Sequence, residues 1–259
     1  MSTSTEVASS TTVRVELAGD RVRVHLACDA PVGAPQVRPL LLGSDARSAR
    51  VALVPDGALL LAEDHVRISV EVGPGAALEL VEPGGTVAYD MGGGWARWDV
   101  SVAVGADASL IWHGEPFVVS GGAGVRRTTR AVVHERAQVA VREVLVLGRH
   151  GEASGRLVQT VVCDDPAGRP LLVEGLDVDA RRAAALLGGN AVMVSAVVLG
   201  AHSCDAGPAT VRYDLEAGGH LYRACAGSVH EAIDHALWDQ VVRAIRSRTS
   251  NSMPTASAR

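Results

Sequence analysis

Three stretches of the chain between Val66 and Val146 repeat one pattern of hydrophobic and polar residues. In each, a strand of alternating apolar and polar positions runs through a turn with a small residue into a second alternating strand. The incoming strands 66–72 and 98–104 match position by position. Aligned at the turns, the repeats superpose Ala76, Ala108 and Ala137, then Leu78, Leu110 and Val139, then Leu80, Trp112 and Val141.

This repeat predicts a mainly β fold. A period of about thirty residues is typical of stacked architectures, and strict alternation predicts strands that bury one face and expose the other. A single hairpin cannot bury its apolar face alone, whereas stacked copies bury theirs against one another. We therefore expect stacked layers of antiparallel or mixed strands. An ordinary antiparallel sandwich, whose hairpins are alike by chance, is the alternative.

The segments that flank the repeats also carry strand and turn signals. Val192 to Leu199 is apolar on both faces, as expected for a buried central strand. Residues 179–187 have helical composition, with Asp179 as the N-cap. Turn residues separate three further pairs of alternating segments, which predict hairpins at 13–17 with 21–26, 156–162 with 170–176, and 210–215 with 220–224.

The C-terminal part predicts one long helix over residues 228–247. Ser228 and Glu231 form a capping-box pattern at its start. Apolar residues then recur at near four-residue steps on one face: Val229, Ile233, Leu237, Val241 and Ile245. Residues 1–12 and 249–259 are polar and low in complexity, and we expect both to be disordered tails. The intervening residues 13–248 are interpreted as a single β-domain that carries this helix.

Composition excludes several classes of function. The net charge is −5 without a basic patch, so nucleic acid is not an expected partner. All 24 basic residues are arginine, which removes Schiff-base lysines and Walker A lysines. The four cysteines form no C-x-x-C pair, residues 1–12 lack the features of a secretory signal, and the most apolar run, 191–200, is too short to span a bilayer. We expect a cytoplasmic protein that does not contact a membrane.

No motif of nucleotide binding or serine hydrolysis is present, because the chain lacks a phosphate loop and a G-x-S-x-G elbow. Two pairs on the predicted C-terminal helix, His230 with Asp234 and Glu231 with His235, have the spacing of divalent-ion ligands. A solvated helix surface is the favoured interpretation of both. The sequence therefore shows no closed metal site.

Acidic residues follow the β core at Glu63, Asp64, Glu82, Glu115, Glu143 and Glu152. Taken singly, most suit solvent-facing strand positions. Glu143 differs, because it shares strand parity with Val141 and Leu145 and is therefore predicted to point inward. A half-buried carboxylate needs a cation or hydrogen-bond donors as partners, and Arg149 is the nearest candidate in the sequence.

Four segments of the chain form an ordered set of motifs: 56–64 followed by a strand and Gly75-Ala76; Thr86, Val87 and Tyr89; 110–116; and 142–149. In order and spacing they resemble the motifs of the UreD (UreH) family of urease accessory proteins, and the resemblance extends over about residues 13–247. Two departures stand out: Glu63-Asp64 keeps only the Asp of the family's G-D pair, and the carboxylate of Glu152 is displaced from the family position.

This resemblance implies a helical β-domain of two stacked strand layers with one or two C-terminal helices. It also implies a scaffold without enzymatic activity, which joins UreF and the GTPase UreG and docks on apo-urease. A polar internal tunnel would pass Ni²⁺ in transit, with no tightly bound cofactor.

On this basis we assign three groups of candidate residues. Transient tunnel contacts are Asp64, Glu115 and Glu143. Residues of the structural motif are Thr86, Tyr89, Gly148 and Arg149. A surface facing UreF is expected at the C-terminal helix and its flanking strands, with an exposed Trp238 beside Leu237 and Val241.

Two other classes of protein fit the pattern less well. A β-solenoid carbohydrate-active enzyme would use acidic residues on one face for general acid and base catalysis. The aromatic content of 3% counts against it, since sugar-binding grooves need stacking platforms. A generic β-type interaction module unrelated to urease is the third interpretation.

Overall fold

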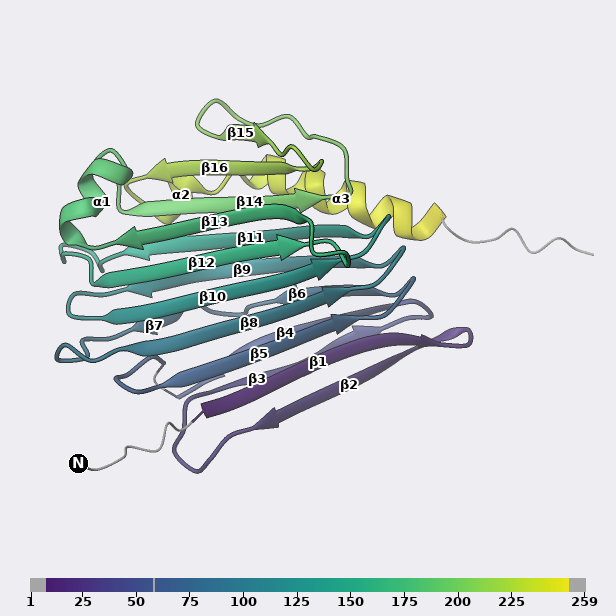
Figure 1. Cartoon of the computed structure of the whole chain (residues 1–259), viewed down its shortest axis with the longest axis horizontal. Helices are drawn as coiled ribbons and strands as arrows, with labels where there is room; N and C mark the ends of the chain where they lie inside the picture. Colours follow the sequence, from purple (N-terminus) through teal and green to yellow (C-terminus); the bar gives the residue numbers. More distant parts are fainter. Residues whose placement is uncertain (1–7, 58, 252–259) are drawn as a thin grey trace, which may run out of the picture.

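The computed structural model describes residues 8–57 and 59–251, whose strands form two sheets that lie face to face (Figure 1). Sheet 1 has seven strands over these residues, in the order β13 (Pro170–Val178), β12 (Arg156–Asp164), β10 (Gly124–Val133), β8 (Ala96–Val104), β5 (His65–Val72), β1 (Ala8–Ala18) and β2 (Arg21–Asp29). Sheet 2 has nine, in the order β15 (Val211–Asp214), β16 (His220–Ala226), β14 (Val192–Leu199), β11 (Gln138–Leu147), β9 (Ser109–Val119), β6 (Ala77–Val81), β4 (Ser48–Asp56) and β3 (Gln36–Ser44), with β7 (Thr86–Ala88) also paired to β9.

Residues that align in the sequence repeat pair with one another in neighbouring parallel strands. Leu78 pairs with Leu110 between β6 and β9, and Leu110 pairs with Val139 between β9 and β11. Val66 and Trp98 likewise pair between β5 and β8. The predicted mainly β, stacked fold is thus confirmed, and the alternative of an ordinary antiparallel sandwich is wrong.

Each repeat unit is an arch between the sheets instead of a hairpin within one sheet. The first strand of the unit lies in sheet 1 and the second in sheet 2, so the chain winds around the interior. Small residues at the turn carry it across: Ala76, Ala108 and Ala137 are each at most 3% exposed. Backbone hydrogen bonds continue from one turn to the next, from Ser109 N to the Ala76 carbonyl and from Gln138 N to the Ala108 carbonyl.

Antiparallel hairpins flank this parallel stack. The pairs β1/β2 and β3/β4 lie at one end, and β12/β13 and β11/β14/β16/β15 lie at the other. The three hairpins predicted from turn residues are all present, and β14 is a buried central strand as expected. The interior between β1, β3, β4 and β5 is filled by aliphatic side chains that include Val13, Val15, Val37, Val51, Leu53, Ile68 and Val70.

The predicted C-terminal helix is broken into α2 (Val229–Ala232) and α3 (His235–Asn251). Ile233 between them is extended, and the Asp234 carboxylate accepts hydrogen bonds from the backbone N–H groups of Leu237 and Gly207. Asp234 therefore acts as a cap on α3 and ties the break to a distant loop. Ser228 makes no side-chain capping bond, so the capping box is absent.

The break also removes the two pairs of candidate metal ligands on this helix. His230 and Glu231 belong to α2, whereas Asp234 lies in the break and His235 begins α3. Residues four apart share a face only within a continuous helix. Upstream, α1 (Ala180–Leu186) forms as predicted, with the Asp179 carboxylate accepting from the N–H groups at its start.

The predicted tails are shorter than expected. Residues 8–12 belong to β1, where Ser9 and Thr11 are buried and the Thr11 hydroxyl donates to the Val37 carbonyl. Residues 249–251 continue α3. The tail prediction is therefore wrong for both segments, and residues 1–7 and 252–259 lie outside the described part of the chain.

Helix α3 packs its apolar face on the outer side of sheet 2. Leu237, Trp238 and Val241 are 4%, 5% and 1% exposed and contact a cluster that includes Ile111 and Tyr222. The prediction of an exposed Trp238 is wrong, because the indole faces the sheet, and these three side chains offer no surface to a partner. None of the helices in the described residues is long and apolar enough to span a membrane.

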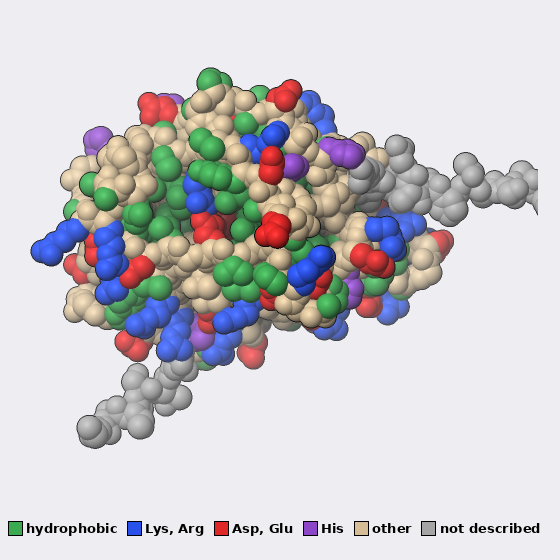
Figure 2. All heavy atoms as spheres, turned by 45° about the horizontal axis from the view of Figure 1, so that its top comes forward, with side chains coloured by type: hydrophobic (Ala, Val, Ile, Leu, Met, Phe, Trp, Pro, Cys, Tyr) green, Lys and Arg blue, Asp and Glu red, His purple; other side chains and the backbone are tan. Residues whose placement is uncertain are grey.

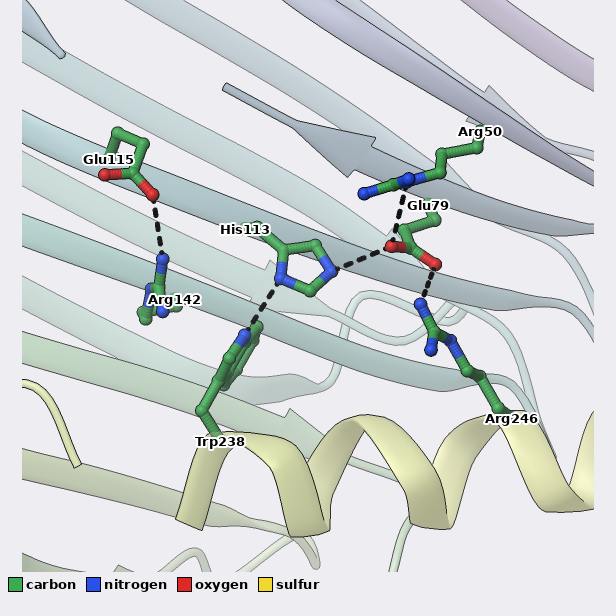
Figure 3. A network of polar contacts seen from close by, with 7 residues as sticks. All are labelled: Arg50, Glu79, His113, Glu115, Arg142, Trp238 and Arg246. Carbon is green, nitrogen blue, oxygen red and sulfur yellow. Dashed lines mark hydrogen bonds and ion pairs between the residues drawn. The ribbon is translucent and has the colours of Figure 1, made fainter. Parts of the chain in front are cut away.

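A polar network fixes α3 beside this apolar cluster (Figure 3). Trp238 Nε1 donates to His113 Nδ1 at 3.0 Å, and His113 Nε2 lies 3.2 Å from Glu79 Oε1. Because an indole N–H only donates, His113 Nδ1 carries no proton and Nε2–H faces the carboxylate. Arg246 of α3 and Arg50 of β4 also contact Glu79, at 2.5 Å and 3.3 Å.

The close contact with the His113 imidazole, together with Arg246, lowers the pKa of Glu79 from its ordinary 4.5 to about 2. A carboxylate whose folded pKa is depressed adds stability above its unfolded pKa and loses it as the pH falls toward the folded value. Glu79 therefore stabilises the packing of α3 on sheet 2, and this stabilisation depends on pH.

We expect Glu79→Gln to lower the free energy of unfolding by about 2 kcal/mol at pH 7, the shift being discounted for partial solvent screening. The difference from the wild type should begin to shrink below about pH 4.5 and fall to roughly half by pH 3. Urea unfolding at several pH values measures it. The control is Glu71→Gln, which removes an exposed ion pair with Arg14 on sheet 1; an equal loss in both variants, or one independent of pH, contradicts the assignment.

Candidate functional site

A cavity of about 90 Å³ lies between the sheets, toward the end formed by β12–β14. Figure 2, turned so that the β13–β16 end comes forward, shows acidic and basic side chains recessed among hydrophobic ones. The apolar part of the wall includes Val100, Val102, Val139, Val141, Val161 and Val197.

Charged side chains interrupt this apolar wall. Ionised groups in such surroundings require partners, because burial removes their hydration. Among the described residues, the cavity is lined by four glutamates and two arginines: Glu82, Glu115, Glu143, Glu174, Arg127 and Arg142.

Glu143 points into the cavity from β11, as strand parity predicts. Its Oε1 lies 2.9 Å from Arg127 Nη2, and Gln159 Nε2 donates to its Oε2 at 3.1 Å. The side chains of Glu143 and Arg127 are 21% and 14% exposed. The partner predicted from sequence, Arg149, is wrong: the cation comes from β10 in the opposite sheet, and Arg149 pairs with Glu152 at 2.9 Å.

Glu82 follows β6 and reaches the same cavity. Its Oε1 accepts from Trp112 Nε1 at 2.8 Å, and its Oε2 accepts from the backbone N–H of Glu115 at 2.9 Å. Burial raises the pKa of Glu82 above its ordinary value, and the hydrogen bonds offset this rise in part. Sequence analysis did not single Glu82 out, although it shares strand parity with the inward-facing Leu78 and Leu80.

Sheet 2 is irregular beside these two residues. Strands β6 and β7 both pair with β9, but the segment 82–85 between them leaves the ladder. The pairing of β9 with β11 shifts register between Arg142 and Val144, where Gly114-Glu115 form a bulge. A Cβ on Gly114 would lie 2.2 Å from the Arg142 carbonyl oxygen, so only glycine fits there. Bulges redirect side chains, and this one brings Glu115 to Arg142.

The Arg142 side chain lies at this bulge. Its Nε donates to the Gly114 carbonyl at 3.2 Å, its Nη2 lies 3.1 Å from Glu115 Oε1, and its guanidinium carbon lies 5.4 Å from the centre of the Trp238 ring. Burial lowers the pKa of Arg142, whereas Glu115 and Glu82 raise it. The guanidinium remains charged at any physiological pH.

An ion pair crosses the open end of the cavity. Glu174 of β13, the edge strand of sheet 1, contacts Arg223 of β16 in sheet 2 at 2.6 Å. Arg223 Nε also donates to Ser195 Oγ at 3.2 Å. The two sheets are thus joined by charge where apolar packing ends.

Asp64 lies apart from this cavity. Its carboxylate accepts from the backbone N–H of Leu61 at 2.6 Å in the turn before β5, and desolvation raises its pKa. Asp64 does not line this cavity. Its side chain stabilises a turn, so the cavity does not support its prediction as a tunnel contact.

The motif residues occupy turns and strand ends. Thr86 is buried at the start of β7 and lines the cavity. The backbone N–H of Tyr89 donates to the Leu60 carbonyl at 3.0 Å. Gly148 has φ +88°, and a Cβ there would lie 2.4 Å from the Glu152 carbonyl oxygen. Arg149 and Glu152 close this turn by their ion pair, which lowers the pKa of Glu152 to about 2.

The cavity offers separate carboxylates in place of a metal cage. Within the described residues, no group of three or more His, Cys, Asp or Glu side chains is arranged to hold a metal ion. Carboxylate oxygens are hard ligands suited to divalent cations. Because Glu143 and Glu115 already face guanidinium groups, such a cation would meet one carboxylate at a time.

Comparisons with known proteins identify the family of the chain. A family model described as UreD urease accessory protein matches residues 12–255. "Urease accessory protein UreD 1" of Streptomyces griseus is 45% identical over 180 residues, which cover 68% of this chain and 69% of that protein. The protein of the same description from Saccharopolyspora erythraea is 37% identical over 179 residues, with the same coverage. "Urease accessory protein UreD" of Frankia casuarinae is 30% identical over 224 residues, covering 76% of this chain and 70% of the relative.

We expect Gly114→Ala to destabilise the protein by about 2 kcal/mol or more, because a methyl group would push the Arg142 carbonyl out of the bulge. Gly43→Ala in β3 is the matched control, since its added Cβ meets nothing within 4 Å. Thermal and urea unfolding of the two variants measure the difference. Equal stability of both would show that the bulge tolerates a side chain.

Proposed function

This chain belongs to the UreD family of urease accessory proteins, which gives it a role in urease maturation, and we propose that it is a scaffold that passes Ni²⁺ to apo-urease through the cavity between its sheets. One observation carries the proposal: carboxylates that are paired with arginines or hydrogen-bond donors line a mainly apolar cavity. Glu143 and Glu115 act as transient contacts for the ion, and Glu82 joins them.

The pairing of carboxylates with arginines in the cavity favours passage of Ni²⁺ and not its storage. Conduction requires that each ligand bind the ion strongly enough to admit it and weakly enough to release it. Glu143 meets this requirement, because Arg127 at 2.9 Å competes for its oxygens.

The partners follow from the same family. We propose that the chain recruits UreF and the GTPase UreG and docks on apo-urease, in the cytoplasm. The GTP chemistry then belongs to UreG, in agreement with the absence of a phosphate loop from this sequence. The family of accessory proteins favours this scaffold over the carbohydrate-active enzyme that the acidic residues allow in principle.

Of the predicted surface for UreF, the strands that flank the C-terminal helix remain as candidates, because Trp238, Leu237 and Val241 of the helix are buried. Strand β15, the edge of sheet 2, presents Val211 and Tyr213, which are 53% and 49% exposed. Exposed apolar side chains on an unpaired edge are typical of an interaction surface. We place the UreF contact there, beside the Glu174–Arg223 pair at the open end.

We expect Glu143→Gln to slow urease activation on the order of tenfold, equivalent to about 1.4 kcal/mol in the barrier to ion passage. Glutamine keeps the hydrogen bond to Gln159 but removes the charge that attracts Ni²⁺. The measurement is the rate at which apo-urease gains activity in a system reconstituted with UreF, UreG and Ni²⁺.

Asp64→Asn provides the matched control, because it also neutralises one acidic group but lies outside the cavity. The assay is run well below the unfolding temperature of each variant, so that lost stability does not lower the rate. Equal activation rates for the two variants would remove the cavity from the path of the ion.

A further inference from the structure

The polar residues of the cavity continue through sheet 2. Glu82 lies on the side of the interior, where it is bonded to Trp112 of the core. Glu115 follows at the bulge, and the N–H of Glu115 donates to Glu82. The interruption between β6 and β7 and the bulge in β9 therefore leave an opening in the hydrogen-bonded ladder, lined by two carboxylates.

Arg142 stands in this opening. It lines the cavity between the sheets and also a second hollow, of about 20 Å³, on the outer face of sheet 2 below α2 and α3. Its guanidinium is bonded to the Gly114 carbonyl and to Glu115. Among the described residues that line these two spaces, Arg142 is the one that lines both.

Helix α3 covers the outer end of the opening. The Trp238 ring lies against the Arg142 guanidinium, with 5.4 Å from the guanidinium carbon to the ring centre, a distance at which a cation and an aromatic ring attract. His113 and Glu79 in turn fix Trp238, as Figure 3 shows. Arg142 is therefore held between a carboxylate on the sheet and an aromatic ring on the helix.

We propose that Arg142 is a tethered cation that closes an opening through sheet 2 and prevents divalent ions from binding tightly at the Glu82–Glu115 pair, so that their contact there stays transient. The inference rests on the proposed function, in that the ion is the Ni²⁺ that the cavity conducts. Two carboxylates near one another repel, and a positive charge that attracts both, as that of Arg142 does, relieves that repulsion. A divalent ion must displace the guanidinium to bind there, whereas without Arg142 the same oxygens form a vacant cation site.

Nickel binding to the isolated full-length protein tests this arrangement. Titration calorimetry with NiCl₂ compares the wild type with Arg142→Met, which keeps an apolar stem but removes the charge. We expect Arg142→Met to gain one site that binds Ni²⁺ at least about tenfold more tightly than any site of the wild type. The double variant Arg142→Met with Glu115→Gln should lose this gain.

Arg136→Met is the matched control for net charge, because Arg136 is paired with Asp107 on the surface, 61% exposed and away from the cavity. Arg142→Lys is a second control, since a lysine keeps the positive charge and should gain no site. If Arg142→Met fails to fold, Arg142→Gln serves in its place, because an amide can still bond to the Gly114 carbonyl.

The inference is overturned if Arg142→Met binds Ni²⁺ no more tightly than Arg136→Met does. It is also overturned if the gain in Ni²⁺ affinity persists in the double variant with Glu115→Gln. A supporting second measurement is the unfolding temperature, which Ni²⁺ should raise in the neutral variant and leave unchanged in the wild type. Failure here is separable from failure of the proposed function, because the latter is read from urease activation by Glu143→Gln and needs no change at Arg142.

Discussion

Burial of one face of every strand in a shared interior is the constraint on which this structure depends. No single arch can bury its apolar face, and stacking in register lets the side chains of β5, β8 and β10 face those of β6, β9 and β11. The backbone ladder runs through the turns as well, so the arches cannot slip by one residue without turning their apolar sets outward. At the end formed by β12–β14, glutamate, glutamine and serine share inward positions with apolar residues, and there the cavity opens.

Charge in that cavity is tolerated because each group finds an opposite charge or hydrogen-bond donors from another strand. Glu143 meets Arg127 across the two sheets, Glu115 meets Arg142 at the bulge, and Glu174 meets Arg223 at the open end. These pairs do more than neutralise charge, since they join elements that apolar packing leaves apart. A carboxylate balanced in this way binds a cation more weakly than an unpaired carboxylate would, in keeping with the proposed passage of Ni²⁺.

The outer face of sheet 2 is connected to this interior through α3. The helix buries Trp238 beside Arg142, and its docking depends on the Glu79–His113 network. A bound partner that displaced α3 would therefore change the surroundings of Arg142 at the opening through the sheet, because Arg142 would lose its contact with the Trp238 ring. Through its apolar and polar contacts, α3 thus connects the surface of the protein to Arg142 and the cavity.

The sequence alone determined what depends on local periodicity. Alternation and the repeat of about thirty residues predicted the β class, the alignment of Leu78, Leu110 and Val139, and the inward direction of Glu143, and the structure shows that the aligned residues pair in parallel strands. Parity also indicates Glu82 and Arg127, which share inward positions with Leu80 and Val125. The order of motifs gave the family, which the comparisons confirm.

Only the tertiary structure decided which of these residues meet. Successive strands of a repeat enter different sheets, so the partner of Glu143 comes from β10 and not from the nearby Arg149. The predicted helix breaks at Asp234 because that carboxylate also binds the N–H of Gly207, 27 residues earlier in the chain. Trp238 is buried because a sheet lies beneath it. Periodicity states which face of an element is apolar, whereas the identity of what covers that face depends on contacts between residues far apart in the chain.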